Sequence, residues 1–192
     1  MSHLIILPSE SANDSGWVSR MASHYGSYFD TIYTQTYSHW EKGKDQIDLQ
    51  VEEAKLTEHL ATIPPGAMII VFAKYAGAIL AILSGQAGVL PAQHCFLFGP
   101  TFDWANREVF SGSFSVVEGF SLPTTIFHSF HDHVSSHLIS KKTADEHMPK
   151  VLFITTTGHK FSYDDYNFYS IYIERTFAEL HLTKPAIATW NT

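Results

Sequence analysis

Three residues with chemically active side chains lie in loops that follow predicted buried strands. They are Tyr75, Asp132 and His159. A carboxylate beside an imidazole fixes the imidazole tautomer, and the imidazole can then take a proton from a hydroxyl group. In an open α/β sheet the ligand site lies beyond the carboxyl ends of the strands. We therefore expect these three side chains to meet at one edge of a sheet, where a ligand would bind.

The stretch 67–83 predicts the structure that carries Tyr75. Residues 67–72 form a short apolar run typical of a buried strand, and residues 76–83 are small and apolar on all sides, as in a buried helix. Tyr75 would then stand at the apex of a tight strand-to-helix turn. Its neighbours Ala73, Ala76 and Gly77 are small, as the strained backbone of such a turn requires.

Other polar residues offer alternatives. Asp103 follows another predicted strand and is a rival to Asp132, which could also simply cap the helix expected after it. A histidine cluster follows one strand: His128, His131, His133 and His137. Zinc needs three or four converging ligands with supporting partners, which this spacing does not supply, so we expect no metal and no cofactor.

Composition limits the classes of protein to which the chain can belong. With 192 residues, 45% hydrophobic and 16% charged, we expect a single folded domain over 1–192, with a loosely attached tail from about residue 183. The formal net charge of −7 and the lack of a basic cluster argue against nucleic acid as a partner. Cys95 alone forms no disulfide, and no signal peptide or membrane span is evident. These features predict a cytoplasmic protein without a membrane partner.

Apolar runs alternate with helical patterns along the chain, which predicts an α/β fold. Because the runs are continuous, they indicate strands buried on both faces of a doubly wound, mainly parallel sheet with helices on both faces. The expected strands are 3–7, 29–34, 67–72, 95–98, 124–128 and 150–155, and the expected helices are 17–26, 48–63, 76–83, 101–110, a helix starting near 134, and 163–180. Residues 37–40 are expected in a loop, and Gly26 is expected to end the first helix as a C-terminal glycine.

Over residues 3–180 the chain resembles the α/β-hydrolase family, in particular its compact, esterase-like serine hydrolases without a large lid. The family's nucleophile elbow is Gly-x-Ser-x-Gly at a strand-to-helix turn, followed in the chain by the acid and then the histidine. The corresponding segment 73–77 reads Ala-Lys-Tyr-Ala-Gly, and Asp132 and His159 follow in that order. The resemblance therefore implies a hydrolase-like site for a small acyl substrate or ligand.

The resemblance also implies a role for each site residue. Tyr75 occupies the nucleophile position, Asp132 the acid position and His159 the general-base position. The backbone N–H of Ala76 would supply half of the oxyanion hole, and the loop after the first strand, around Ser9 and Glu10, would supply the other half.

The tyrosine is a strong departure from the family pattern, because a phenol lies several ångströms further from the backbone than a serine hydroxyl. Three interpretations follow. The chain is a pseudoenzyme or binding protein in which Tyr75 fills the pocket. Alternatively, it belongs to an active ester-hydrolase lineage in which Tyr75 replaces serine, naturally or by engineering. In the third, Tyr75 and His159 work as an acid–base pair.

Overall fold

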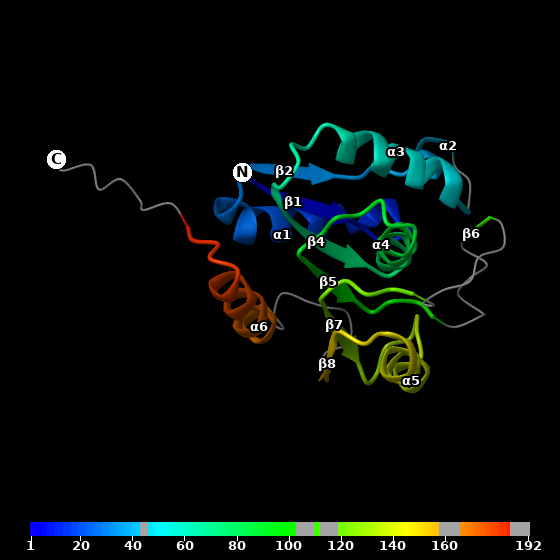
Figure 1. Ribbon diagram of the computed structural model, residues 1–192. Coiled ribbons are helices and arrows are strands. Elements are labelled where there is room, and N and C mark those ends of the chain that lie inside the picture. The colour runs from blue at the N-terminus through cyan, green and yellow to red at the C-terminus, as the bar shows by residue number, and fades with distance from the viewer. Residues whose placement is uncertain (43–45, 103–109, 112–118, 158–165, 185–192) are drawn as a thin grey trace.

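The structure is a computed structural model of the chain, and it describes residues 1–42, 46–102, 110–111, 119–157 and 166–184. Its centre is a six-stranded sheet in the order β2-β1-β4-β5-β7-β8, and each pair of neighbours is parallel. Figure 1 shows this sheet with helices on both sides. The strands are β1 (Ser2–Leu7), β2 (Thr31–Thr34), β4 (Met68–Lys74), β5 (His94–Phe98), β7 (Thr124–Ser129) and β8 (Val151–Thr156), with β3 (Ile47–Asp48) and β6 (Phe110–Ser111) pairing separately.

Helices cover both faces of the large sheet. The helices are α1 (Ser15–Tyr25), α2 (Ser38–Lys42), α3 (Leu49–Ala61), α4 (Ala76–Gln86), α5 (His137–His147) and α6 (Tyr166–Glu179), with short 3-10 turns at Ala12–Asp14 and Gly26–Tyr28. One core contains buried residues of α3, α4 and α5, and the other contains those of α1 and α6. The doubly wound, mainly parallel α/β sheet predicted from the sequence is therefore confirmed.

The alternation of side chains along β4 explains how one strand serves two cores. Ile70 and Phe72 point toward α1 and α6, whereas Val71 and Ala73 point toward α4. Because neither face meets water, the strand has no polar alternation and appears as a continuous apolar run in the sequence.

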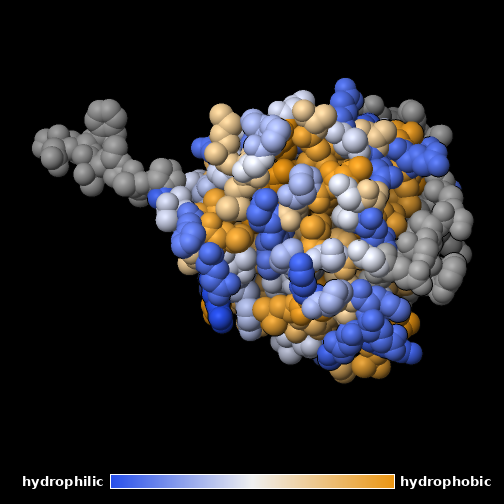
Figure 2. All heavy atoms as spheres, in the orientation of Figure 1, coloured by the Kyte–Doolittle hydropathy of each residue, from blue (hydrophilic) through white to orange (hydrophobic). Residues whose placement is uncertain are grey.

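The outer face of α5 carries charged side chains. On α5, ion pairs join Lys141 to Asp145 and Lys142 to Glu146 across one helical turn. Figure 2 shows hydrophilic side chains gathered over this helix, with hydrophobic patches beside them. None of the helices in the described ranges is long and apolar enough to cross a membrane.

Several local expectations were wrong, and one concerns a segment that lies largely outside the described residues. Residues 37–40 were expected in a loop, whereas Ser38–Lys42 form the short helix α2. Gly26 does end α1, but its φ of −58° is right-handed, so a left-handed cap is not the reason for the glycine. A Cβ at Gly26 would lie 2.6 Å from Ile32 Cδ1, so the backbone of Gly26 packs closely against the side chain of Ile32. The helix expected at 101–110 lies largely outside the described residues.

The start of α4 approaches the end of β1 so closely that only glycine fits at residue 77. A Cβ on Gly77 would lie 2.2 Å from the carbonyl oxygen of Leu7 and 2.4 Å from that of Pro8. Both obstacles are backbone atoms in the sheet and its first loop, so neither can rotate away. This contact sets the distance between the turn after β4 and the loop after β1.

We predict that Gly77→Ala lowers the free energy of unfolding by about 3 kcal/mol, because the new methyl group forces the backbone of α4 away from β1. Urea denaturation measures the change. Gly16→Ala is the matched control, since its Cβ meets only the mobile end of Arg20 at 3.4 Å. The control should be neutral or stabilising by up to about 1 kcal/mol. Equal effects of the two substitutions would contradict the close-approach argument.

Candidate active site

Tyr75 alone forms the turn between β4 and α4. Lys74 ends the strand and Ala76 begins the helix, so the chain reverses direction within one residue. The backbone of Tyr75 has φ 48° and ψ −111°, a conformation that side chains rarely adopt. Its N–H donates a hydrogen bond to the carbonyl of Phe98 at 2.9 Å, and its own carbonyl accepts from Ala78 at 3.1 Å. The surrounding structure thus holds Tyr75 in a strained conformation, as at many functional sites.

The phenol of Tyr75 is buried and faces negative charge. The residue is 9% exposed and packs with the core on the α1 and α6 side. Burial raises the pKa of Tyr75 well above its usual 10.0, and the charge of Asp132 and a hydrogen bond with it raise the pKa further. The carboxylates of Glu10 and Asp14 add smaller contributions in the same direction. The phenol therefore stays protonated at neutral pH.

Asp132 lies in the loop after β7, as the sequence predicted, and the fold brings it to Tyr75. Its Oδ1 accepts hydrogen bonds from the N–H groups of Val134 at 2.7 Å and Ser135 at 3.4 Å. These bonds fix the carboxylate in a turn. The cap of α5 is instead Ser136, which accepts from Ile139 N–H, so Asp132 is not the helix cap.

Of the remaining predicted site residues, the structure describes Ala76 and Ser9. His159 and the rival acid Asp103 lie outside the described residues. Ala76 is the first residue of α4, where a helix leaves its backbone N–H groups without intrahelical acceptors. The Ser9 N–H donates to Oδ2 of Asp14 at 3.1 Å, so an internal carboxylate occupies this predicted oxyanion donor.

A buried ion pair lies directly beside the turn. Lys74 Nζ is 2.6 Å from Asp14 Oδ1, and the two side chains are 11% and 9% exposed. The ammonium group lies 5.5 Å from the ring centre of Trp17 and 5.3 Å from that of Tyr75, within the range of cation–π attraction. The ion pair therefore links the loop before α1 to the turn after β4.

This ion pair was not predicted from the sequence, although the position of Lys74 in β4 indicated that its side chain would be buried. Lysine side chains are mostly exposed in folded proteins and are seldom buried without a paired charge. Period-two alternation places it on the same side of β4 as Ile70 and Phe72, toward α1. A buried lysine requires a partner. Nothing in the sequence marked Asp14 as that partner, because the two residues are far apart in the chain.

Aromatic side chains at the start of α2, and Tyr37 just before it, hold the loop after β1. The Tyr37 hydroxyl donates to the carbonyl of Pro8 at 2.8 Å, and burial raises the pKa of Tyr37 well above its usual value. His39 Nε2 and Trp40 Nε1 each donate to the carbonyl of Glu10 at 2.7 Å. These bonds explain why residues 37–40 are ordered as a helix start, and they fix the loop opposite Tyr75.

The histidine cluster forms a separate arrangement near β7 and β8. His128 is fully buried, and its Nδ1 donates to the carbonyl of Ser129 at 3.0 Å. His137 bonds Thr155 through Nε2 at 2.9 Å and packs edge-on against His128, with ring centres 5.6 Å apart. Within the described ranges, no three histidine, cysteine, aspartate or glutamate side chains converge to hold a metal ion.

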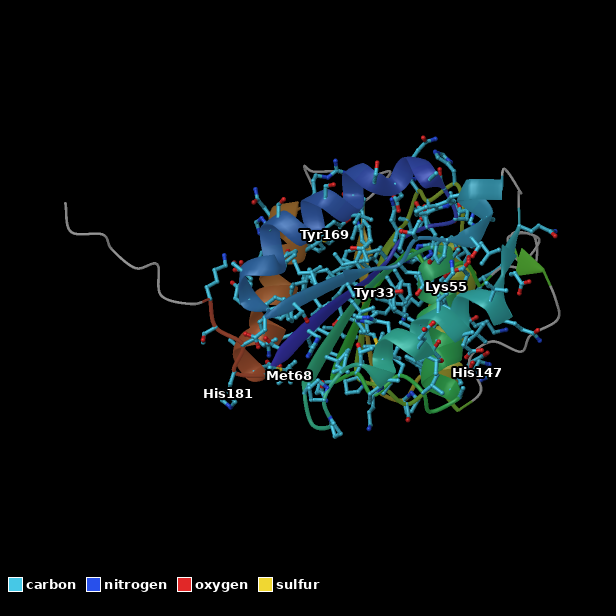
Figure 3. The ribbon with its side chains drawn as sticks, turned by 90° about the horizontal axis from the view of Figure 1, so that it is seen from above. Tyr33, Lys55, Met68, His147, Tyr169 and His181 are labelled. Atoms are coloured by element: carbon cyan, nitrogen blue, oxygen red, sulfur yellow. The ribbon has the colours of Figure 1, made fainter. Side chains whose placement is uncertain are left out.

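Two surface hollows lie away from Tyr75. One, of about 450 Å³, lies between β2 and α3 and includes Tyr33 and Lys55, which Figure 3 shows on the same side of the molecule. The other, of about 530 Å³, lies at the amino ends of the strands and includes His94. Burial lowers the pKa of His94 to about 4, so this histidine is neutral. In an α/β sheet the amino ends of the strands are the edge opposite the usual ligand site.

Comparisons with known proteins agree with this architecture. No protein-family model matches the sequence, and a search of curated proteins finds no match. Among solved structures, a Xanthomonas campestris protein assigned as a hydrolase of the alpha/beta superfamily matches with a TM-score of 0.70 and 17% identity, over 94% of this chain and 98% of that one.

Two further structures match over nearly the whole chain. A YdeN-like protein from Pectobacterium atrosepticum, assigned as a hydrolase, has a TM-score of 0.69 and 17% identity over 95% of this chain and 94% of its own. Est1E from Butyrivibrio proteoclasticus, solved with ferulic acid bound, has a TM-score of 0.72 and 10% identity over 95% and 90%. Identities this low establish architecture alone. The strand order, the turn at Tyr75 and these likenesses together show that the chain has the α/β-hydrolase fold.

Proposed function

We propose that this protein is a catalytically impaired member of the small, esterase-like serine hydrolases, a pseudoenzyme that binds a small acyl compound rather than hydrolysing it. The observation that carries the proposal is the state of Tyr75. It stands at the strained apex where this fold holds its nucleophile, and its phenol is buried against Asp132.

Burial and charge both work against Tyr75 as a nucleophile. A hydroxyl attacks an acyl carbon efficiently only as its proton leaves, and a phenol with a raised pKa holds its proton more tightly. The same shift weakens the acid–base interpretation, since an effective catalytic group has a pKa near the working pH. The size of the ring adds a steric obstacle, because it fills the space that an acyl group needs beside a serine.

A second candidate function keeps the active ester-hydrolase lineage, with Tyr75 in place of serine. Two observations favour it. The strained backbone at residue 75 persists, and Asp132 still faces that position from the loop after β7. In that case only the side chain of residue 75 separates the protein from acyl-transfer activity, and His159 would serve as the general base.

We further propose a cytoplasmic setting without nucleic-acid or membrane partners. Cys95 is a free, fully buried cysteine on β5, as expected for a protein that relies on its apolar core rather than on disulfides. The ligand is then a small intracellular acyl compound that reaches the carboxyl edge of the sheet.

The state of the phenol predicts how stability depends on pH. A raised folded-state pKa contributes stability that is fully present below the unfolded pKa of 10.0 and is lost as the pH rises through the folded pKa. Above about pH 10 the unfolding free energy of the wild type should fall more steeply than that of Tyr75→Phe, by about 1.4 kcal/mol per pH unit. Urea denaturation of both proteins between about pH 9 and pH 11 measures this. Equal slopes would mean that Tyr75 ionises at its ordinary pKa.

Enzyme assays test the proposal directly. Wild type should hydrolyse a short p-nitrophenyl ester no faster than Tyr75→Phe, which keeps the ring and removes the hydroxyl, and it should not react with a fluorophosphonate probe. Robust wild-type turnover that Tyr75→Phe and His159→Ala both abolish would overturn the pseudoenzyme proposal in favour of catalysis through Tyr75.

Tyr75→Ser separates the two candidate functions. If the second is correct, Tyr75→Ser gains fluorophosphonate labelling, because the serine stands on an intact elbow, and adding His159→Ala removes the gain. Tyr75→Ala is the matched control, since it opens the same space without supplying a hydroxyl. Labelling of Tyr75→Ala as strong as that of Tyr75→Ser would show that the probe reacts elsewhere.

A further inference from the structure

The carboxylate of Asp14 is held as a bound ligand would be. Its Oδ1 lies 2.6 Å from the Lys74 ammonium, and its Oδ2 accepts the Ser9 N–H at 3.1 Å. All three residues are less than 10% exposed. An ammonium group and a backbone N–H that bind the two oxygens of one carboxylate form a charge-assisted anion site.

Asp14 does not make the helix-cap hydrogen bond that is usual for an aspartate at its position. It stands at the N-cap position of α1, where an aspartate normally accepts a hydrogen bond from an N–H of its own helix. Here the side chain makes no cap hydrogen bond. Its oxygens turn to donors from the loop after β1 and from the end of β4.

Other carboxylate–lysine pairs in the described part of the chain differ in burial. Lys141 and Asp145 on α5 are 48% and 56% exposed, and Lys55, the partner of the buried Glu52, is 37% exposed. Exposed pairs contribute little because water solvates each charge separately. Water does not solvate the buried charge of Lys74 in this way. Loss of Asp14 would therefore leave a buried positive charge beside the rings of Trp17 and Tyr75.

We propose that Lys74 and the Ser9 N–H form a binding site for a small carboxylate anion beside Tyr75, and that Asp14 occupies this site as an internal ligand. The intact protein therefore excludes free carboxylates from this position. An external carboxylate binds there once the side chain of residue 14 is removed. The inference does not depend on the chemistry of residue 75, so it holds whichever of the candidate functions is correct.

Asp14→Gly with acetate tests the site. Acetate has the carboxylate and methyl carbon of an aspartate side chain, so it can restore the missing anion without a covalent link. The backbone of residue 14 has φ −78° and ψ 2°, which glycine tolerates. In sodium acetate the thermal midpoint of Asp14→Gly should rise by several degrees more than in equimolar sodium chloride, and it should rise with acetate concentration as expected for ligand binding to the folded state. Wild type should show no acetate-specific rise.

Two variants control for general anion effects. Asp14→Gly/Lys74→Met lacks the cation of the site and should lose the acetate-specific rise. Asp145→Gly removes the partner of the exposed Lys141 by the same type of substitution, and acetate should act on it no better than chloride. If both Asp14→Gly and Asp145→Gly responded equally to acetate, the effect would be non-specific and the proposal would be wrong.

The test remains decisive if Asp14→Gly is unfolded in chloride. Far-ultraviolet circular dichroism should then show acetate-specific recovery of the folded state, and its absence at saturating acetate would overturn the proposal. An equal acetate response of the wild type would also overturn it, because Asp14 would then not close the site. These readouts follow anion-dependent stability, so they are distinguishable from the acyl-transfer assays on Tyr75.

Discussion

The contact between Gly77 and the carbonyl groups of Leu7 and Pro8 is the constraint on which the rest of the site depends. It brings the first turn of α4 against the end of β1, the strand that pairs with β4 in the sheet. With that distance fixed, the chain must leave β4 and enter α4 within one residue. The positive φ of Tyr75 is the consequence, and its N–H bond to the Phe98 carbonyl secures the turn from the neighbouring strand.

A strained residue costs about 1–3 kcal/mol, and such strain persists only where the surroundings leave no alternative. Here both sides of the turn are fixed: the strand pairs with β1 and β5, and the helix is buried all round. The backbone geometry therefore does not depend on the side chain at residue 75. This explains how a large aromatic side chain can stand at so tight a turn, and why the shape of the turn alone does not establish activity.

The sequence was sufficient for the features that depend on local pattern. Apolar and β-branched runs identified β1, β4, β5, β7 and β8, and the small residues beside Tyr75 identified the turn. Asp132 could be placed at the same edge because parallel strands share their carboxyl ends. The short helix α2 could not be predicted, since its order comes from bonds of Tyr37, His39 and Trp40 to a loop far away in the chain. The Asp14–Lys74 pair was missed for the same reason.

The charged side chains around Tyr75 favour the neutral form of its phenol. The carboxylates of Asp132, Glu10 and Asp14 all raise the pKa of the phenol. One cation, Lys74, lies beside the ring, but its ammonium is already bound to Asp14. A neutral phenol suits such a field, whereas the negative oxygen that develops during ester hydrolysis would be opposed by it. Hydrolases meet that charge with free N–H donors at the elbow. The Ser9 N–H is bound to Asp14, so it is not a free donor of this kind. The field of the three carboxylates therefore favours the neutral side chain that the protein carries.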